Sequence, residues 1–284
     1  MIVIHHPRRF DRLTRIRTLD PVRDCHDIYR TTALYEFPFD IRMGLLLAFW
    51  RTFAVPSVAE LLLSTGETTH RTKRRADDTG ILMYTLIHHG LDHPLGRAAT
   101  RRINQLHRRY TISNDDHLYI LGTFIFVGAR WIDQHGWRPL CCHERTAMYH
   151  FYAELGRRMN IHHIPPTLQH YADWYDRFES ERFAFTPAAA QLMTATKGLL
   201  ANLPGPLGPL SERLADALID TPMRNAVGLA TPPLWARALL TGALTGRAAL
   251  LRHLAPPRKT QHQPDGFQAK TYPNGYDITT VGPT

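Results

Sequence analysis

Apolar residues recur at every third or fourth position along most of this chain, whereas strict alternation over five or more residues is hard to find. A spacing of three to four matches the α-helix, and a spacing of two would match a half-buried strand. The pattern therefore predicts an all-α protein. The predicted helices lie at residues 22–30, 40–50, 55–64, 73–88, 95–110, 114–132, 143–159, 167–182, 187–200, 212–220 and 234–254.

The amino-acid composition of the chain changes after residue 185. Proline and glycine become frequent, and they break the region into short Ala/Leu-rich helices. We therefore expect a main helical domain at residues 1–185, a C-terminal helical extension at 186–256 and a loosely ordered tail at 257–284. A short strand is expected within that tail, at 268–272.

The helix expected at 95–110 carries a histidine on its apolar side. His107 lies four residues after Ile103 and three before Tyr110, so helical spacing turns its imidazole inward. An inward, neutral imidazole can ligate a metal or haem iron through one nitrogen. The alternative is a core histidine that bonds to a backbone carbonyl. The expected stripe consists of Leu95, Ala99, Ile103, Leu106 and Tyr110.

Three polar residues lie at the start of one face of the helix expected at 73–88. Arg75, Asp78 and Thr79 are three and four residues apart and therefore share that face. An arginine and a hydroxyl can hydrogen-bond reacting oxygen atoms, and a carboxylate can accept a proton. The structural alternative is an Arg75–Asp78 ion pair one turn apart. Asp77 and Asp78 would then favour the positive end of the helix dipole, and Thr79 would bond to a carbonyl of its own helix.

Several short motifs give the chain a resemblance to a known family. It resembles the MpaB and rubber-oxygenase family over about residues 35–185. The motifs are Arg74-Arg75-Ala76-Asp77-Asp78-Thr79, the run from Arg102 to Asp116, Tyr119-Ile120-Leu121, Arg130-Trp131-Ile132, Gly136-Trp137-Arg138 and the run from Leu155 to Ile161.

The resemblance implies a helical, globin-like core that binds haem b. It implies that His107 is the proximal iron ligand and that Arg75, Asp78 and Thr79 form the distal side. Arg102 and Arg109 are then candidates to flank the haem propionates, although both could simply face solvent. In the rubber-cleaving branch a lysine takes the middle distal position. Asp78 stands there in this chain, which puts long-chain rubber in doubt as a substrate.

Asp78 also sits beside a cationic arginine, so we expect its carboxylate to stay ionised. It can then act as a general base once substrate excludes water from the pocket.

The charge of the chain gives little support to nucleic-acid binding. Its 34 basic and 25 acidic residues are interleaved, and no zinc-finger, RNP or KH pattern is present. We therefore expect no nucleic-acid partner. A weaker alternative is that the net charge of +9 favours contact with anionic membrane surfaces, which would suit an oily substrate.

Three cysteines without a CxxC pair indicate neither a disulfide scaffold nor structural zinc. The apolar runs fall short of the ~18 residues that span a bilayer. We expect a cytoplasmic protein, with peripheral membrane association as a further expectation.

Other common chemistries lack their motifs. The chain has no G-x-S-x-G elbow, P-loop or dinucleotide fingerprint. The histidines around Gly90 and the pair His162-His163 lack the HExxH spacing of a zinc enzyme, so solvated loop histidines are the simpler interpretation.

The sequence thus predicts a haem b-dependent oxygenase that uses dioxygen to cleave a carbon–carbon double bond in an isoprenoid, terpenoid or other lipophilic small molecule. One alternative is a haem- or lipid-binding helical protein without turnover. Another is a helical interaction protein without a cofactor.

Overall fold

The computed structural model describes residues 9–200, 208–262, 269 and 271–283. Within these residues every regular element is a helix and none is a strand, which confirms the all-α prediction. The elements in chain order are α1 (Asp11–Ile16), α2 (Cys25–Thr31), the π-helix η1 (Thr32–Glu36), α3 (Pro38–Arg51), the 3-10 turn η2 (Thr52–Ala54), α4 (Pro56–Ser64), α5 (Glu67–His70), α6 (Thr72–His89), α7 (Pro94–His107), α8 (Asn114–His135), α9 (Cys142–Arg158), α10 (Leu168–Arg182), α11 (Pro187–Thr196), the 3-10 turn η3 (Lys197–Leu199), α12 (Gly208–Ala217), α13 (Thr221–Ala226) and α14 (Leu234–His253).

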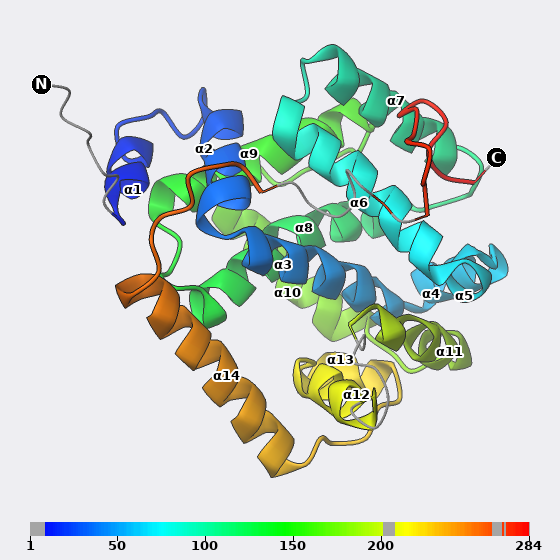
Figure 1. The fold of residues 1–284 in the computed structure, drawn as a ribbon. Coiled ribbons are helices and arrows are strands. Elements are labelled where there is room, and N and C mark those ends of the chain that lie inside the picture. The colour runs from blue at the N-terminus through cyan, green and yellow to red at the C-terminus, as the bar shows by residue number, and fades with distance from the viewer. Residues whose placement is uncertain (1–8, 201–207, 263–268, 270, 284) are drawn as a thin grey trace, which may run out of the picture.

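Helices α3 and α8 pack against each other at the centre of the molecule, and the other helices surround them (Figure 1). Their close approach depends on glycine. A Cβ atom on Gly44 of α3 would lie 2.6 Å from the Cα atom of Gly128 on α8. Because backbone rather than a flexible side chain occupies that space, a larger residue would force the two helices apart. Large side chains such as Trp50 and Phe53 are fully buried in the surrounding core.

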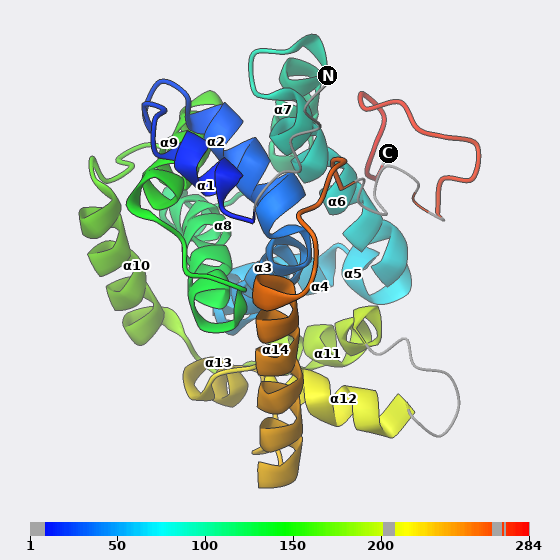
Figure 2. The same ribbon diagram turned by 60° about the vertical axis from the view of Figure 1, so that its left-hand side comes forward.

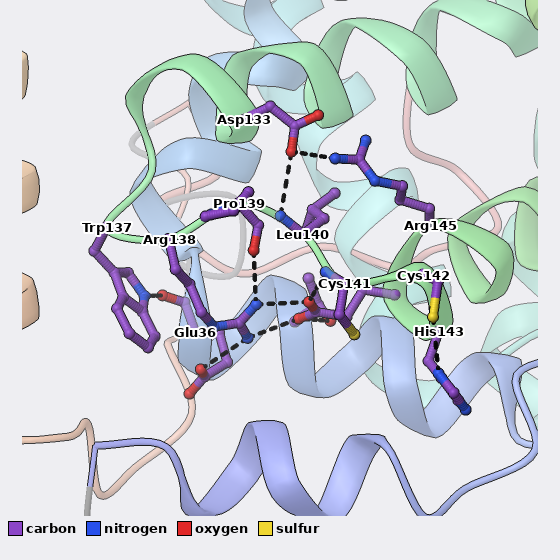
Figure 3. Close-up of polar contacts among 12 residues, drawn as sticks. Glu36, Asp133, Trp137, Arg138, Pro139, Leu140, Cys141, Cys142, His143 and Arg145 are labelled. Carbon is purple, nitrogen blue, oxygen red and sulfur yellow. Dashed lines mark hydrogen bonds and ion pairs between the residues drawn. The ribbon is translucent and has the colours of Figure 1, made fainter.

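A buried ion-pair network holds the segment between α8 and α9 (Figure 3). The Arg138 guanidinium donates to Glu144 of α9 at 2.6 and 2.9 Å and to Glu36 of η1 at 3.1 Å. Trp137 donates its indole N–H to the Glu36 carbonyl at 3.0 Å. Removal of one partner would leave a buried charge, which typically costs about 3–5 kcal/mol. Two residues of the Gly136-Trp137-Arg138 motif therefore have structural roles.

Helix ends agree with the cap residues in the sequence at several places. Ser113 caps α8 by accepting a hydrogen bond from the Asp116 N–H at 3.0 Å, and Thr167 caps α10 in the same way through His170 at 3.2 Å. The predicted end of the helix at 95–110 was wrong, because α7 ends at His107. Tyr110 therefore lies outside the helix and is exposed.

The C-terminal extension is attached to the main body through a buried carboxylate. Arg247 of α14 donates to both oxygens of Asp40 on α3, at 2.9 and 3.0 Å, and the Trp131 indole of α8 donates to the same carboxylate at 3.2 Å. The rest of α14 runs along the edge of the molecule and projects beyond the core in Figure 2.

The tail that we expected to be loosely ordered packs closely in its described part. Val281 is fully buried, and Ile278 is nearly so. In Figures 1 and 2 this red segment lies beside α6 and α7. Residues 268 and 270 of the expected strand lie outside the described residues, and 269, 271 and 272 are not in a strand.

No single described helix combines the length and hydropathy needed to cross a bilayer. The helix pair Pro38–Ala54 and Pro56–Ser64, which bends by 101°, meets the criterion by length and composition alone.

Candidate functional site

The candidate site is formed where the start of α6 meets the end of α7, and we call this place the α6–α7 corner. The two helices are joined by only four residues, so they run back along each other as a hairpin (Figure 1). Gly90 ends α6 with a φ of +84°, and a Cβ on Gly96 would lie 1.8 Å from the Gly90 carbonyl oxygen. Glycine at both positions therefore lets the hairpin close and brings Arg75 near His107.

His107 is the last residue of α7, and its side chain is half-buried. Its Nδ1 atom is buried and has no hydrogen-bond partner among the described residues. Burial, with smaller contributions from His117 and Arg75, lowers the pKa of His107 to about 4. The imidazole is therefore neutral at physiological pH, which is the form that ligates metals.

Arg75 and Thr79 contact each other on the same face of α6. The Arg75 guanidinium donates to the Thr79 hydroxyl, which donates in turn to the Arg75 carbonyl at 3.2 Å. The Phe49 ring of α3 lies 5.7 Å from the guanidinium carbon. Burial lowers the pKa of Arg75, and the nearby Asp78 carboxylate opposes this effect. Arginine stays cationic in proteins, so this corner keeps a fixed positive charge.

Asp78 is 4% exposed and accepts a hydrogen bond from the Tyr272 hydroxyl. Burial raises the pKa of Asp78, while Tyr272 and Arg75 partly offset that rise. Burial has the largest effect, so the pKa of Asp78 lies above its ordinary value despite the neighbouring arginine. No ion pair joins Arg75 and Asp78 among the contacts of the described residues.

The helix-dipole explanation of these acids is also weak. Helix α6 begins at Thr72 and has no acidic residue in its first turn. Interaction with the dipole falls off within that turn, and Asp78 lies beyond it.

Arg102 and Arg109 both bind the C-terminal segment. The buried Arg102 donates from Nε to the Val281 carbonyl at 2.6 Å and from Nη2 to the Pro283 carbonyl at 3.2 Å. Arg109 donates to the same Pro283 carbonyl at 3.1 Å. A role of the two arginines toward haem propionates stays a prediction.

Two residues of this region were not identified from sequence. The His117 ring of α8 lies 5.3 Å from the His107 ring between centroids, and Tyr272 reaches Asp78 from 194 residues along the chain. Helical spacing could place His117 near the start of α8, but it says nothing about which helices meet. No local signal could have predicted the Tyr272 contact.

The remaining histidines of the described residues do not gather into a cluster that could bind a metal ion. In the described part of the chain, no group of three or more His, Cys, Asp or Glu side chains could hold a metal ion. His93 instead caps α7, since its side chain accepts a hydrogen bond from the Leu95 N–H at 3.2 Å.

The corner thus combines three chemical functions. It has a neutral imidazole at His107, a fixed cation with a hydroxyl partner at Arg75 and Thr79, and a buried carboxylate at Asp78. These groups suit axial ligation, stabilisation of developing negative charge and proton transfer, respectively.

Comparison with known proteins identifies one family model and several relatives that carry the same family name. The family model "ER-bound oxygenase mpaB/B'/Rubber oxygenase, catalytic domain" matches residues 39–252. The protein named ER-bound oxygenase mpaB' of Penicillium brevicompactum is 28% identical across 81% of this chain and 59% of its own length. The protein named ER-bound oxygenase mpaB of Penicillium roqueforti (strain FM164) is 26% identical across 72% of this chain and 75% of its own length. The chain therefore spans about three fifths of the P. brevicompactum relative.

Proposed function

Because this chain belongs to the family of ER-bound oxygenases mpaB/B' and rubber oxygenases, we propose that it is a haem b-dependent oxygenase with its site at the α6–α7 corner. Its substrate in this proposal is a lipophilic small molecule of the isoprenoid or terpenoid class. The reaction would cleave a carbon–carbon double bond with dioxygen, so that each former alkene carbon becomes a carbonyl with one oxygen atom.

The observation that carries this proposal is the environment of His107. Its imidazole is neutral, and its buried Nδ1 lacks a hydrogen-bond partner among the described residues. A buried polar atom without a partner is costly, and a metal or haem iron bound by this imidazole would offset that cost. A proximal haem ligand needs a neutral imidazole held at a fixed place on a helix, and His107 fits this requirement. Haem, when bound, would supply the activation of dioxygen.

The α6 residues would then provide the remaining chemistry. Arg75 and Thr79 offer N–H and O–H donors that can stabilise negative charge developing on the reacting oxygen atoms. Asp78 can accept an allylic proton from the substrate and return it before the two carbonyl products leave, because the overall cleavage neither gains nor loses a proton. Its raised pKa makes it a better base near neutral pH than an ordinary aspartate. Asp78, in place of the lysine of the rubber-cleaving branch, argues against long-chain rubber as the substrate.

A haem or lipid carrier without turnover is the alternative function. It would share the fold and His107, but it would not require Arg75 and Thr79 to act on oxygen. The two functions differ in whether a product forms.

Aerobic incubation of the haem-loaded protein with candidate isoprenoids, followed by mass-spectrometric detection of carbonyl products, tests the proposed function. We expect Arg75→Ala to retain haem and to lose more than about tenfold in turnover, which corresponds to at least ~1.4 kcal/mol in the barrier. The control is Lys73→Ala, an exposed position on the same helix. The proposed function would be contradicted if no candidate isoprenoid gave a product, or if Arg75→Ala and wild type had equal turnover.

We also propose that α14 contacts an anionic lipid surface, where an oily substrate would be collected. Leu239 and Leu250 share one face of α14 and are 51% and 52% exposed, and Leu234 at its start and Leu254 just after its end are 82% and 77% exposed. Residues 221–262 contain basic side chains but no Asp or Glu. An apolar face flanked by positive charge is typical of helices that lie in the membrane interface.

A further inference from the structure

The C-terminal segment at residues 271–283 reaches the polar face of α6. The Thr271 hydroxyl donates to Asp77 at 2.6 Å, and the Tyr272 hydroxyl donates to Asp78. In Figure 1 and Figure 2 the segment lies beside α6 and α7, although it comes from the end of the chain. It therefore supplies side chains to the face on which the oxygenase site is proposed.

Arg102 of α7 and Arg109, which follows that helix, hold this segment at its far end. Arg102 and Arg109 donate to the Val281 and Pro283 carbonyls, as described above. Gly282 has a φ of +96°, and a Cβ there would lie 2.9 Å from Leu106 Cδ1. The segment thus packs in a conformation that favours glycine, directly beside the residue that precedes His107.

Tyr272 is held within the segment by contacts on two sides. The Gly282 backbone hydrogen-bonds to its hydroxyl, and the Tyr276 ring lies 5.9 Å away between centroids. The Arg74 guanidinium carbon lies 4.6 Å from its ring centroid. These contacts leave the hydroxyl proton directed at Asp78.

We propose that Tyr272 is a positioning residue of this site, and that its hydroxyl holds the Asp78 carboxylate in the orientation and ionised form that accept a proton. The inference rests on the proposed role of Asp78. An O–H donor bonded to one carboxylate oxygen restrains the side chain and leaves the other oxygen available to substrate. It also stabilises the ionised form, against the burial that raises the pKa of Asp78.

The groups around Asp78 set the expected effect of removing the hydroxyl. Arg74, Arg75 and Asp77 lie on its own helix, and Tyr272 faces it from the C-terminal segment. The two arginines and Tyr272 favour the ionised carboxylate, whereas Asp77 opposes it. Tyr272→Phe removes one favourable contact and leaves the other three groups, so the pKa of Asp78 should rise further.

A role limited to anchoring the tail would give a different result. Tyr272→Phe would then destabilise the protein equally at every pH, because no titrating group would be affected. Tyr276→Phe is the matched control, since Tyr276 packs on Tyr272 but has no hydrogen bond to Asp78 among the described contacts.

Unfolding by denaturant from about pH 4.5 to about pH 7.5 provides a readout that does not need activity. A raised folded-state pKa of Asp78 contributes stability at low pH that is lost as the pH rises through that pKa. Tyr272→Phe raises the pKa of Asp78 further, so this variant should lose more of its free energy of unfolding than wild type does as the pH rises. We expect the gap in unfolding free energy between wild type and Tyr272→Phe to grow with pH, and the gap for Tyr276→Phe to stay constant. In an Asp78→Asn background the growth should vanish.

The pH–rate profile provides the second readout. A hydrogen bond contributes about 0.5–1.5 kcal/mol, so the acidic limb of turnover should move upward by about 0.4–1 pH unit in Tyr272→Phe. A pH-independent gap together with an unmoved acidic limb would overturn the inference. Absence of turnover in wild type would instead refute the proposed function, and growth of the unfolding gap would then still show that Tyr272 sets the protonation of Asp78.

Discussion

At the scale of single residues, burial changes the pKa values of the side chains at the candidate site. The same desolvation makes His107 a weaker base and Asp78 a stronger one. It thereby places a neutral imidazole and a carboxylate of raised pKa within one corner of the fold. Both pKa shifts favour the uncharged form of the side chain, because a charged group loses its hydration when it is buried.

Asp78→Asn tests the base directly, since it keeps the size of the side chain and removes its basicity. We expect haem content and substrate binding to be retained and turnover to fall by about 10²–10⁴-fold, the range of general-base catalysis. Steady-state kinetics with product quantification measures this change. Lys73→Ala, at an exposed position on the same helix, is the control. Undiminished turnover of Asp78→Asn across neutral pH would leave Asp78 with a structural role only.

The sequence was sufficient to align Arg75, Asp78 and Thr79, because helical spacing alone decides which residues share a face. It also predicted the bond from Thr79 to its own helix, which the structure confirms. It could not predict that Tyr272 binds Asp78 or that Arg102 and Arg109 bind the tail. Such contacts depend on where a segment without periodicity packs, and periodicity was the available signal.

At the scale of elements, the long helices were predicted well, and several of the short ones were missed. The predicted range 114–132 corresponds to α8 (Asn114–His135), whose cap residues are present in the sequence. The short helices α1 (Asp11–Ile16) and α5 (Glu67–His70) were missed, since one or two turns carry too few apolar positions to show a period.

Helix α14 gives a prediction at this scale. The paired substitution Leu239→Glu and Leu250→Glu changes two exposed positions, so the fold should persist while binding to phosphatidylcholine vesicles that contain phosphatidylserine falls at least about tenfold. Co-sedimentation measures the bound fraction. Leu95→Glu on α7 is the control, because Leu95 is also exposed but lies outside α14. Equal vesicle binding by the paired variant, or a stable dimer in light scattering that covers this face, would count against the lipid surface.

At the scale of the whole molecule, contacts from far apart in the sequence assemble the α6–α7 corner. The hairpin brings His107 and Arg75 together, and the C-terminal segment adds Tyr272. The last described residues of the chain thus pack against the candidate site. This explains why the tail, which looks polar and irregular as a sequence, is ordered in its described part.

The central claim is that His107 holds haem, and the haem content of purified His107→Ala tests it most directly. The account predicts that wild type shows a Soret band that His107→Ala loses, while helical circular dichroism stays the same. His117→Ala, which removes the neighbouring imidazole, should retain the band. Full haem content and an unchanged spectrum in His107→Ala would contradict the account.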